Sequence, residues 1–265
     1  MNKRKTKKVS TVMICILSLF LASSTVLANT ASSPYSTPKI KGHTYTFTSE
    51  VWTRNFTTGT TAEAVASVKA SASVPNGYMG AMARLYTSGG SLTASSSMTY
   101  NTSKTSSFFV YSPRITTKTT YYAQNVGEFY NGNGYTRYTG YKSPNLKLSN
   151  VNSSNVLFEN NTETSETIHE LLLQTKYDVN SQGDTYGSAL SEPIIGVEPD
   201  LIAAIGTNGI EGYLKAEDLT PKITTIEEVL AQTQVNGTVR TIHLYDVEGD
   251  NIIGEFDVVT DYKVE

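Results

Sequence analysis

The chain has 265 residues, a formal net charge of −3 and one cysteine, Cys15. A single cysteine excludes a scaffold stabilised by disulfides within the chain. The absence of a nucleic-acid-binding motif argues against a nucleic-acid partner. The length is enough for one large or two modest domains.

The first 28 residues have the pattern of a signal peptide. Five basic residues precede an apolar run, residues 11–22, that is too short to span a membrane comfortably. Val26-Leu27-Ala28 then supplies small residues before a cleavage site, which we expect between Ala28 and Asn29. An uncleaved anchor is the alternative. Cleavage would remove Cys15 and leave a mature chain without cysteine or transmembrane segment, which fits secretion by a Gram-positive bacterium.

Charge divides the mature chain into two halves. Residues 29–148 contain eleven basic and three acidic residues, a net of +8, whereas residues 149–265 contain five basic and twenty-one acidic residues, a net of −16. This contrast predicts two domains, 44–148 and 167–265, joined by a polar linker at 149–166. Opposite charges would attract the halves to each other; in the alternative, the domains are independent and the charges only aid solubility.

The basic half begins with a predicted loose segment, residues 29–43, which is rich in Ser, Thr and Pro. Residues 62–74 then alternate between Ala or Val and mostly polar side chains, a period of two that is typical of a half-buried strand. Pro75-Asn76-Gly77 is a turn signal, and the alternation resumes at residues 79–86. We therefore expect one long antiparallel hairpin from residue 62 to residue 87.

Further strands are predicted at residues 45–52, 92–100, 108–111 and 119–130. The Asn131–Gly134 sequence, Asn-Gly-Asn-Gly, favours a hairpin that returns through residues 135–141. No helical periodicity interrupts these strands. The pattern predicts an antiparallel β-sandwich over residues 44–148, with a closed barrel as the alternative.

Aromatic and basic residues around this last hairpin form the candidate ligand-binding site. Tyrosine combines a flat apolar face with a polar tip, which suits sugar stacking and protein contacts. The competing interpretation is that tyrosine simply packs well across strands. The candidate residues are Tyr121, Tyr122, Tyr130, Tyr135, Arg137, Tyr138, Tyr141 and Lys142. The positive charge of this half also predicts contact with an anionic cell-wall polymer, weakened by salt.

The acidic half opens with a possible metal motif. Asp178, Asn180, Gln182 and Gly183 match the first half of a calcium-binding loop, but Ala189 stands where a closing Glu is needed. We therefore expect a polar turn between two strands and no bound metal.

Residues 201–205 and 210–214 read as two buried strands around a tight turn, and residues 241–258 as a final hairpin. Thr225 followed by Glu228 predicts a short helix that begins with a capping box. Residues 167–265 are thus expected to be a small, β-rich α+β domain, and the whole protein to be mainly β.

Three segments of this half carry a resemblance: Tyr177–Ser188, Pro199–Leu214 and Ile242–Phe256. Over about residues 170–260 the chain resembles a module of uncharacterised exported and envelope proteins of Gram-positive bacteria. The resemblance implies an extracellular or wall-associated location, and it implies no activity and no catalytic residue.

No catalytic motif stands out. His43, His169 and His243 lie in separate segments, and no zinc-protease, nucleophile-elbow or phosphate-loop pattern is present. We expect no catalytic residue and no cofactor. The predicted function is that of a secreted, non-catalytic protein that binds anionic cell-wall polymer, carbohydrate or another envelope protein. A secreted carbohydrate-active or wall-lytic hydrolase is the alternative.

Overall fold

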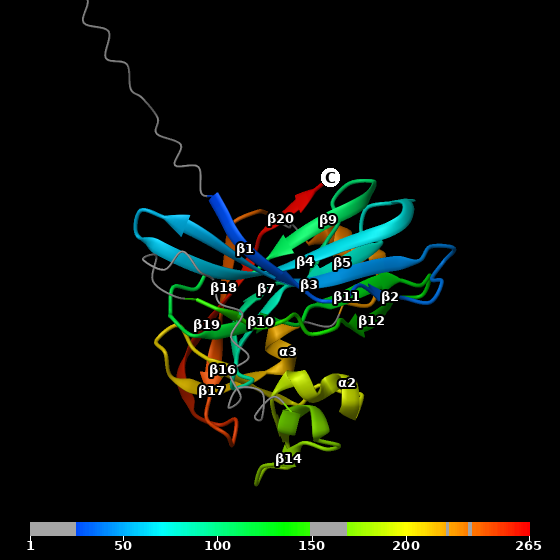
Figure 1. Ribbon diagram of the computed structural model, residues 1–265. Helices are drawn as coiled ribbons and strands as arrows, with labels where there is room; N and C mark the ends of the chain where they lie inside the picture. The colour runs from blue at the N-terminus through cyan, green and yellow to red at the C-terminus, as the bar shows by residue number, and fades with distance from the viewer. Residues whose placement is uncertain (1–24, 149–168, 221–222, 233–234) are drawn as a thin grey trace, which may run out of the picture.

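The computed structural model describes residues 25–148, 169–220, 223–232 and 235–265. The protein is mainly β, as predicted, and its strands form three sheets (Figure 1). Short helical elements lie only in the acidic half of the described chain: residues 169–173, η1 (Ala189–Ser191), α2 (Glu192–Ile195), α3 (Ala216–Leu219) and α4 (Ile226–Ala231).

A six-stranded sheet forms the upper layer in Figure 1, with strand order β1-β3-β4-β9-β20 and β2 also paired to β3. Its strands are β1 (Thr25–Ala31), β2 (Tyr35–Ser36), β3 (Tyr45–Phe56), β4 (Gly59–Val74), β9 (Thr105–Tyr111) and β20 (Tyr262–Val264). Along β3, alternate residues from Tyr45 to Thr53 are buried, so one face of the sheet points into a core.

A four-stranded sheet with the order β12-β11-β5-β8 lies beneath it. Its strands are β5 (Met79–Met82), β8 (Thr99–Tyr100), β11 (Val126–Tyr130) and β12 (Tyr135–Thr139). The main core contains Phe47 and Phe108 from the upper sheet, Phe129 from this sheet and Leu85 from the third. This core is that of a β-sandwich, in which side chains from facing sheets interdigitate.

The third sheet has ten strands, in the order β13-β10-β6-β7-β19-β18-β17-β16-β15-β14. Its strands are β6 (Arg84–Thr87), β7 (Leu92–Ser96), β10 (Thr120–Ala123), β13 (Leu146–Lys147), β14 (Asp178–Val179), β15 (Thr185–Gly187), β16 (Leu201–Ile205), β17 (Glu211–Lys215), β18 (Thr238–Tyr245) and β19 (Ile252–Thr260).

Strand β7 of the basic half pairs with two strands of the acidic half. One edge of β7 is paired with β6; along the other edge it runs parallel to β16 at Leu92 and parallel to β19 at Ser95 and Ser96. Because β19, β18, β17 and β16 follow one another in the sheet, these pairings close a ring of five strands. Leu92 of β7 belongs to the same buried cluster as Ile202, Leu244 and Phe256 of the acidic half.

The two halves of the chain are therefore joined by sheet hydrogen bonds, which corrects the picture of separate domains at 44–148 and 167–265. A second junction lies at β20, which pairs with β9 in the upper sheet. The contrast in charge misled the prediction because backbone pairing is indifferent to net charge. The linker predicted at 149–166 lies outside the described residues.

The long hairpin predicted for residues 62–87 is also wrong. Strand β4 pairs with β3 on one edge and β9 on the other, so β5 has no free edge to join. Instead the chain passes at Pro75–Gly77 from the six-stranded sheet into the four-stranded sheet, where β5 pairs with β11 and β8. The predicted strand 119–130 is likewise divided, since β10 and β11 lie in different sheets.

The predicted loose segment 29–43 is partly a strand. Asn29–Ala31 continue β1, and Tyr35 and Ser36 form β2; both strands pair with β3. The pairing of Asn29 with Trp52 gives the segment backbone partners that its composition does not reveal.

Several local predictions are confirmed. Tyr130 faces Tyr135 across the Asn-Gly turn, β16 pairs with β17, and β18 pairs with β19. Helix α4 begins with the expected capping box between Thr225 and Glu228. In the described residues, no helix has both the length and the apolar character needed to cross a membrane.

Candidate functional site

The predicted tyrosine site does not form one surface. Tyr121 is 1% exposed within the sandwich core, and Tyr122 is fully buried on the opposite side of β10. The Tyr121 hydroxyl donates a hydrogen bond to the Thr117 carbonyl at 2.8 Å. Because neither ring reaches the surface, these two residues are corrected to structural roles.

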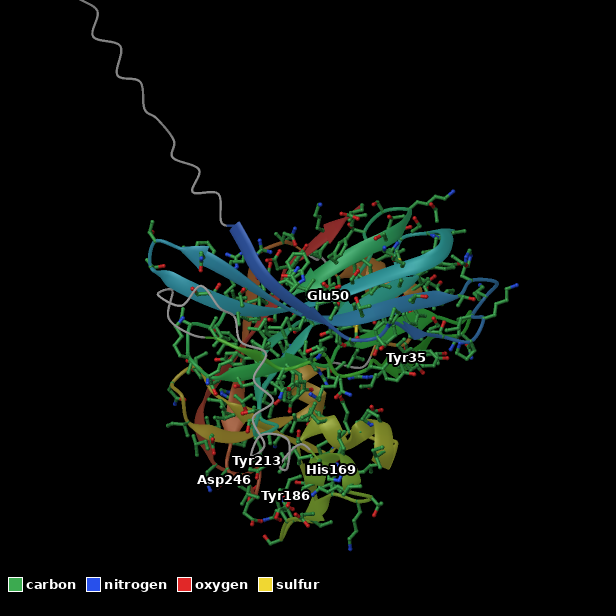
Figure 2. The ribbon with its side chains drawn as sticks, in the orientation of Figure 1. Tyr35, Glu50, His169, Tyr186, Tyr213 and Asp246 are labelled. Carbon is green, nitrogen blue, oxygen red and sulfur yellow. The ribbon has the colours of Figure 1, made fainter. Side chains whose placement is uncertain are left out.

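The other predicted residues fall into separate groups. Tyr130 and Tyr135 have ring centroids 5.7 Å apart at the Asn-Gly hairpin, and the Lys41 ammonium lies 5.0 Å from the Tyr130 ring centroid. Tyr138 and Tyr141 instead surround Tyr35, whose position Figure 2 shows, at 5.8 and 5.4 Å.

Lys142 places its ammonium 4.3 Å from the centroid of the Tyr122 ring. Burial lowers the pKa of Lys142 to about 8. The ammonium also donates hydrogen bonds to the Ser143 carbonyl and to Asn145 Oδ1, so it is partly buried and engaged within the protein and is poorly placed to attract an anionic polymer.

Much of the positive charge of the basic half is neutralised internally. Arg54 and Arg114 both form ion pairs with Glu63, which the sequence pattern had assigned to the solvent face of β4. Glu63 is only 1% exposed. Arg84 and Arg137 both bind Glu198 of the acidic half. The surface is therefore less basic than the net of +8 suggests.

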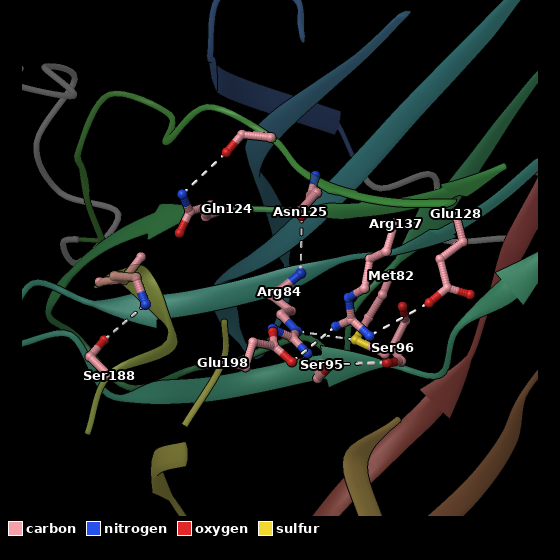
Figure 3. A network of polar contacts seen from close by, with 12 residues as sticks. Met82, Arg84, Ser95, Ser96, Gln124, Asn125, Glu128, Arg137, Ser188 and Glu198 are labelled. Atoms are coloured by element: carbon pink, nitrogen blue, oxygen red, sulfur yellow. Dashed lines mark hydrogen bonds and ion pairs between the residues drawn. The ribbon is translucent and has the colours of Figure 1, made fainter. Parts of the chain in front are cut away.

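The Glu198 contacts form a buried polar network between the halves (Figure 3). Arg137 Nη2 lies 3.1 Å from Glu198 Oε2, and its Nη1 lies 3.5 Å from Glu128 Oε1. The Tyr100 hydroxyl donates to Glu128 Oε2 at 2.6 Å. Every acid in the network has a cationic or hydroxyl partner, which is what burial of charge requires.

The network holds its groups in their charged forms. Burial alone would raise the pKa of the Glu198 carboxyl, but Arg84 and Arg137 more than offset it and the pKa is lowered. Burial alone would lower the pKa of Arg84, and the contacts with Glu198 and Tyr86 raise it instead. A carboxylate locked in this way joins the two halves and is not free to accept a substrate proton.

A hollow of about 340 Å³ lies where four segments of the chain meet. The loop after β9 provides residues 113–117, β7 provides Thr93, and the end of β16 with its turn and β19 provide the rest. The residues from these last segments are Ile205, Gly206, Thr207, Gly209, Phe256 and Asp257. The volume falls within the range of small-molecule sites.

Backbone pairing fixes the walls of this hollow. Ala62 and Ile115 exchange backbone hydrogen bonds of 2.8 and 2.9 Å, which hold the loop against β4. Thr207 donates its backbone N–H to the Glu255 carbonyl at 2.9 Å, which ties the turn to β19. These hydrogen bonds fix the loop and the turn, and with them the side chains that line the hollow.

Arg114 is the cationic group of this hollow, and its guanidinium has donors available for a ligand. Its Nε donates to Glu63 Oε2 at 3.1 Å, and 46% of its side chain is exposed. Nη1 and Nη2 make no further hydrogen bond within the described part of the chain. The guanidinium is thus oriented by Glu63 while two of its nitrogens can donate to a ligand.

The other polar groups of the hollow are hydroxyls and one carboxylate. Thr93, Thr116 and Thr117 can both donate and accept, and Asp257 accepts a 2.7 Å hydrogen bond from Thr241 through one oxygen. Among the described lining residues, Asp257 is the only carboxylate. The arrangement is suited to binding a hydroxyl-rich ligand; acid–base hydrolysis of a glycosidic bond ordinarily uses two carboxylates.

The turn with the calcium-like pattern is held by hydrogen bonds within itself and by others to the turn between β18 and β19, such as that from Asn180 Nδ2 to the Val247 carbonyl at 3.0 Å. Asn180 Oδ1 accepts from the backbone N–H groups of Gln182 and Asp184 at 3.0 and 2.8 Å. This confirms the predicted polar turn, which lies between β14 and β15. In the part of the chain that the structure describes, no three His, Cys, Asp or Glu residues are placed to hold a metal ion.

Comparison with known proteins adds no family to this picture. No protein-family model, curated protein or solved structure matches the chain. The function must therefore be argued from the residues and their geometry.

Proposed function

We propose that the protein is a secreted, non-catalytic binding protein of the cell envelope that holds hydroxyl-rich carbohydrate in the Arg114 hollow. The observation that supports it most directly is the combination of Arg114, threonine hydroxyls and a single carboxylate in one hollow of about 340 Å³. Sugars are bound by several such donors and acceptors together with apolar contact. Ile115 and Ile205 supply apolar contact here.

Export is part of the proposal and rests on the pattern of residues 1–28 and on the resemblance to envelope proteins of Gram-positive bacteria. The protein would be released or retained at the wall after cleavage following Ala28. N-terminal sequencing of the protein recovered from culture medium or wall extract tests this part separately: a start at Asn29 supports it, and recovery of the full chain from the cytoplasm contradicts it.

Binding is tested with purified wall glycan, from which anionic polymers have been removed, in a pull-down over a range of salt concentrations. We expect the wild type to bind and to keep binding as salt rises, because hydroxyl contacts are screened less than long-range charge. Arg114→Gln should weaken binding roughly tenfold, since a hydrogen bond from a charged group contributes about 1.5–3 kcal/mol. Lys69→Gln, at an exposed lysine of β4, is the matched control.

Two outcomes would contradict the proposal. Binding that disappears with salt and requires added anionic polymer would favour the purely electrostatic function. Release of reducing sugar from the same glycan, abolished in Asp257→Asn, would show the hydrolase instead.

A further inference from the structure

A group of tyrosines outside the predicted site lies beside the hollow on the acidic half. Tyr213 of β17 and Tyr245 of β18 are directly opposite each other in the sheet. Tyr186 of β15 stands edge-on to Tyr213, with ring centroids 5.6 Å apart. Figure 2 shows Tyr186 and Tyr213 together at the lower end of the molecule, far from Glu50 on the upper sheet.

Packing in the hydrophobic core does not account for the position of these rings. Each is partly exposed, and none belongs to a buried cluster of the described chain. Lys215 places its ammonium 4.7 Å from the Tyr245 ring centroid, so the group also carries a donor. Partly exposed aromatic rings with neighbouring donors are suited to stacking against sugars.

Strand register connects these rings to the hollow. Ile205 lines the hollow, and Ala203 is the next residue of β16 on the same face. Two residues along a strand span about 7 Å. Tyr213 lies directly opposite Ala203, which places its Cβ about 5 Å from that of Ala203. The small Ala203 side chain thus separates the hollow from the first ring.

The charge along this face favours a neutral ligand. Glu211 and Glu255 are exposed beside Tyr213 and the hollow, and Asp178 lies near Tyr213. Burial raises the pKa of the Tyr213 hydroxyl, and Tyr186, Asp178 and Glu211 act in the same direction. Nearby carboxylates would repel a polyanion, whereas they can accept hydrogen bonds from the hydroxyls of a neutral sugar.

We propose that the Arg114 hollow and the Tyr213–Tyr245 pair form one extended site for a neutral polysaccharide chain, with the hollow holding a first sugar and the tyrosines stacking on the sugars that follow. This rests on the proposed carbohydrate binding and gives its ligand class: a linear neutral glycan of several units. Such a site gains affinity with each added sugar until the tyrosine pair is covered.

The test uses the full chain and two series of neutral β-1,4-linked probes, cello-oligosaccharides and chito-oligosaccharides of one to six units, in calorimetric titrations. For at least one series, we expect affinity to rise at least tenfold with length and then to level off. Tyr213→Ala and Tyr245→Ala should flatten this rise while leaving the affinity for the shortest bound sugar unchanged. Tyr141→Ala, at an exposed ring outside this group, should change nothing.

The experiment distinguishes failure of the extended site from failure of the proposed function. Binding that depends on Arg114 but not on chain length or Tyr213 would overturn the extended site and leave the proposed function standing. If neither series binds at any length, the extended site is rejected, and the wall-glycan pull-down decides separately whether the proposed function survives.

Discussion

Arg84 of β6 and Glu198, just before β16, form an ion pair between the two halves of the chain. Only 2% of the Arg84 side chain and 16% of the Glu198 side chain are exposed. A charge buried to this degree is stable only while its partner is present. The pair therefore fixes how the segment before β16 sits against the sandwich.

The first prediction concerns the loss of this partner. Glu198→Ala should lower the free energy of unfolding by about 3–5 kcal/mol, because it leaves Arg84 buried and unpaired. Urea denaturation measures this. Glu265→Gln, which removes an exposed partner of Lys263, should cost no more than about 1 kcal/mol. The double variant Arg84→Met with Glu198→Leu should recover much of the loss; a Glu198→Ala protein as stable as wild type would refute the role of the pair.

The second prediction is an acid dependence of stability. The pKa of Glu198 is lowered in the folded protein, while an unfolded glutamate titrates near about 4.3. The stabilisation is therefore complete above that value and is lost as the pH falls through the folded pKa. Thermal melts between pH 6 and pH 2 should show a shallower acid loss in Glu198→Gln than in wild type.

Asp261 provides a control of opposite sign for this measurement. Burial, with Glu63 adding to it, raises the pKa of Asp261. Its contribution is therefore present at low pH and declines as pH rises through its folded value. Asp261→Asn should steepen the loss of stability on acidification, so identical effects of both substitutions would contradict the assignment.

The third prediction concerns Lys142, whose pKa is lowered to about 8 by burial. Between that value and the ordinary lysine pKa of about 10.4, the unfolded chain binds more protons, so stability rises with pH. Lys142→Met should raise the melting temperature at pH 7 and show a smaller gain at pH 9.5. An unchanged or lowered melting temperature at pH 7 would show that the ammonium is favourably solvated. Lys147→Met, at an exposed lysine nearby, is the matched comparison.

The fourth prediction follows from the ring of five strands. A chain consisting of residues 167–265 lacks β7, and it leaves β16 and β19 without the partner that closes the ring. We expect it to show no cooperative thermal transition, whereas residues 25–265 unfold in a single step. A cooperative melt of the short chain would restore the two-domain description.

Turns and alternation were readable from the sequence because they are local. The Asn-Gly hairpin, the capping box at Thr225 and the final hairpin need only neighbouring residues to be recognised. Partner strands are not local: β4 alternates as expected, yet its sequence does not reveal that β3 and β9 occupy both its edges.

The candidate site could not be predicted from the sequence for the same reason. Arg114, Ile205 and Asp257 come from segments far apart in the chain and meet through the pairing of the Arg114 loop with β4 and of β16 and β19 with β7. The sequence does contain one signal of the buried network. Arg84 stands between Ala83 and Leu85 in an otherwise apolar strand, a position that favours a buried, paired charge over a solvated one.

The pairing of strand β1 determines whether the proposed cleavage can occur before or after folding. Ala28 and Asn29, between which cleavage is proposed, are consecutive residues of β1 paired with Thr53 and Trp52. A peptidase binds its substrate as an extended, unpaired segment, so a folded precursor would withhold this bond. Processing would then have to precede the docking of β1, and a chain that folded first would keep the bond between Ala28 and Asn29 within the edge strand of the upper sheet.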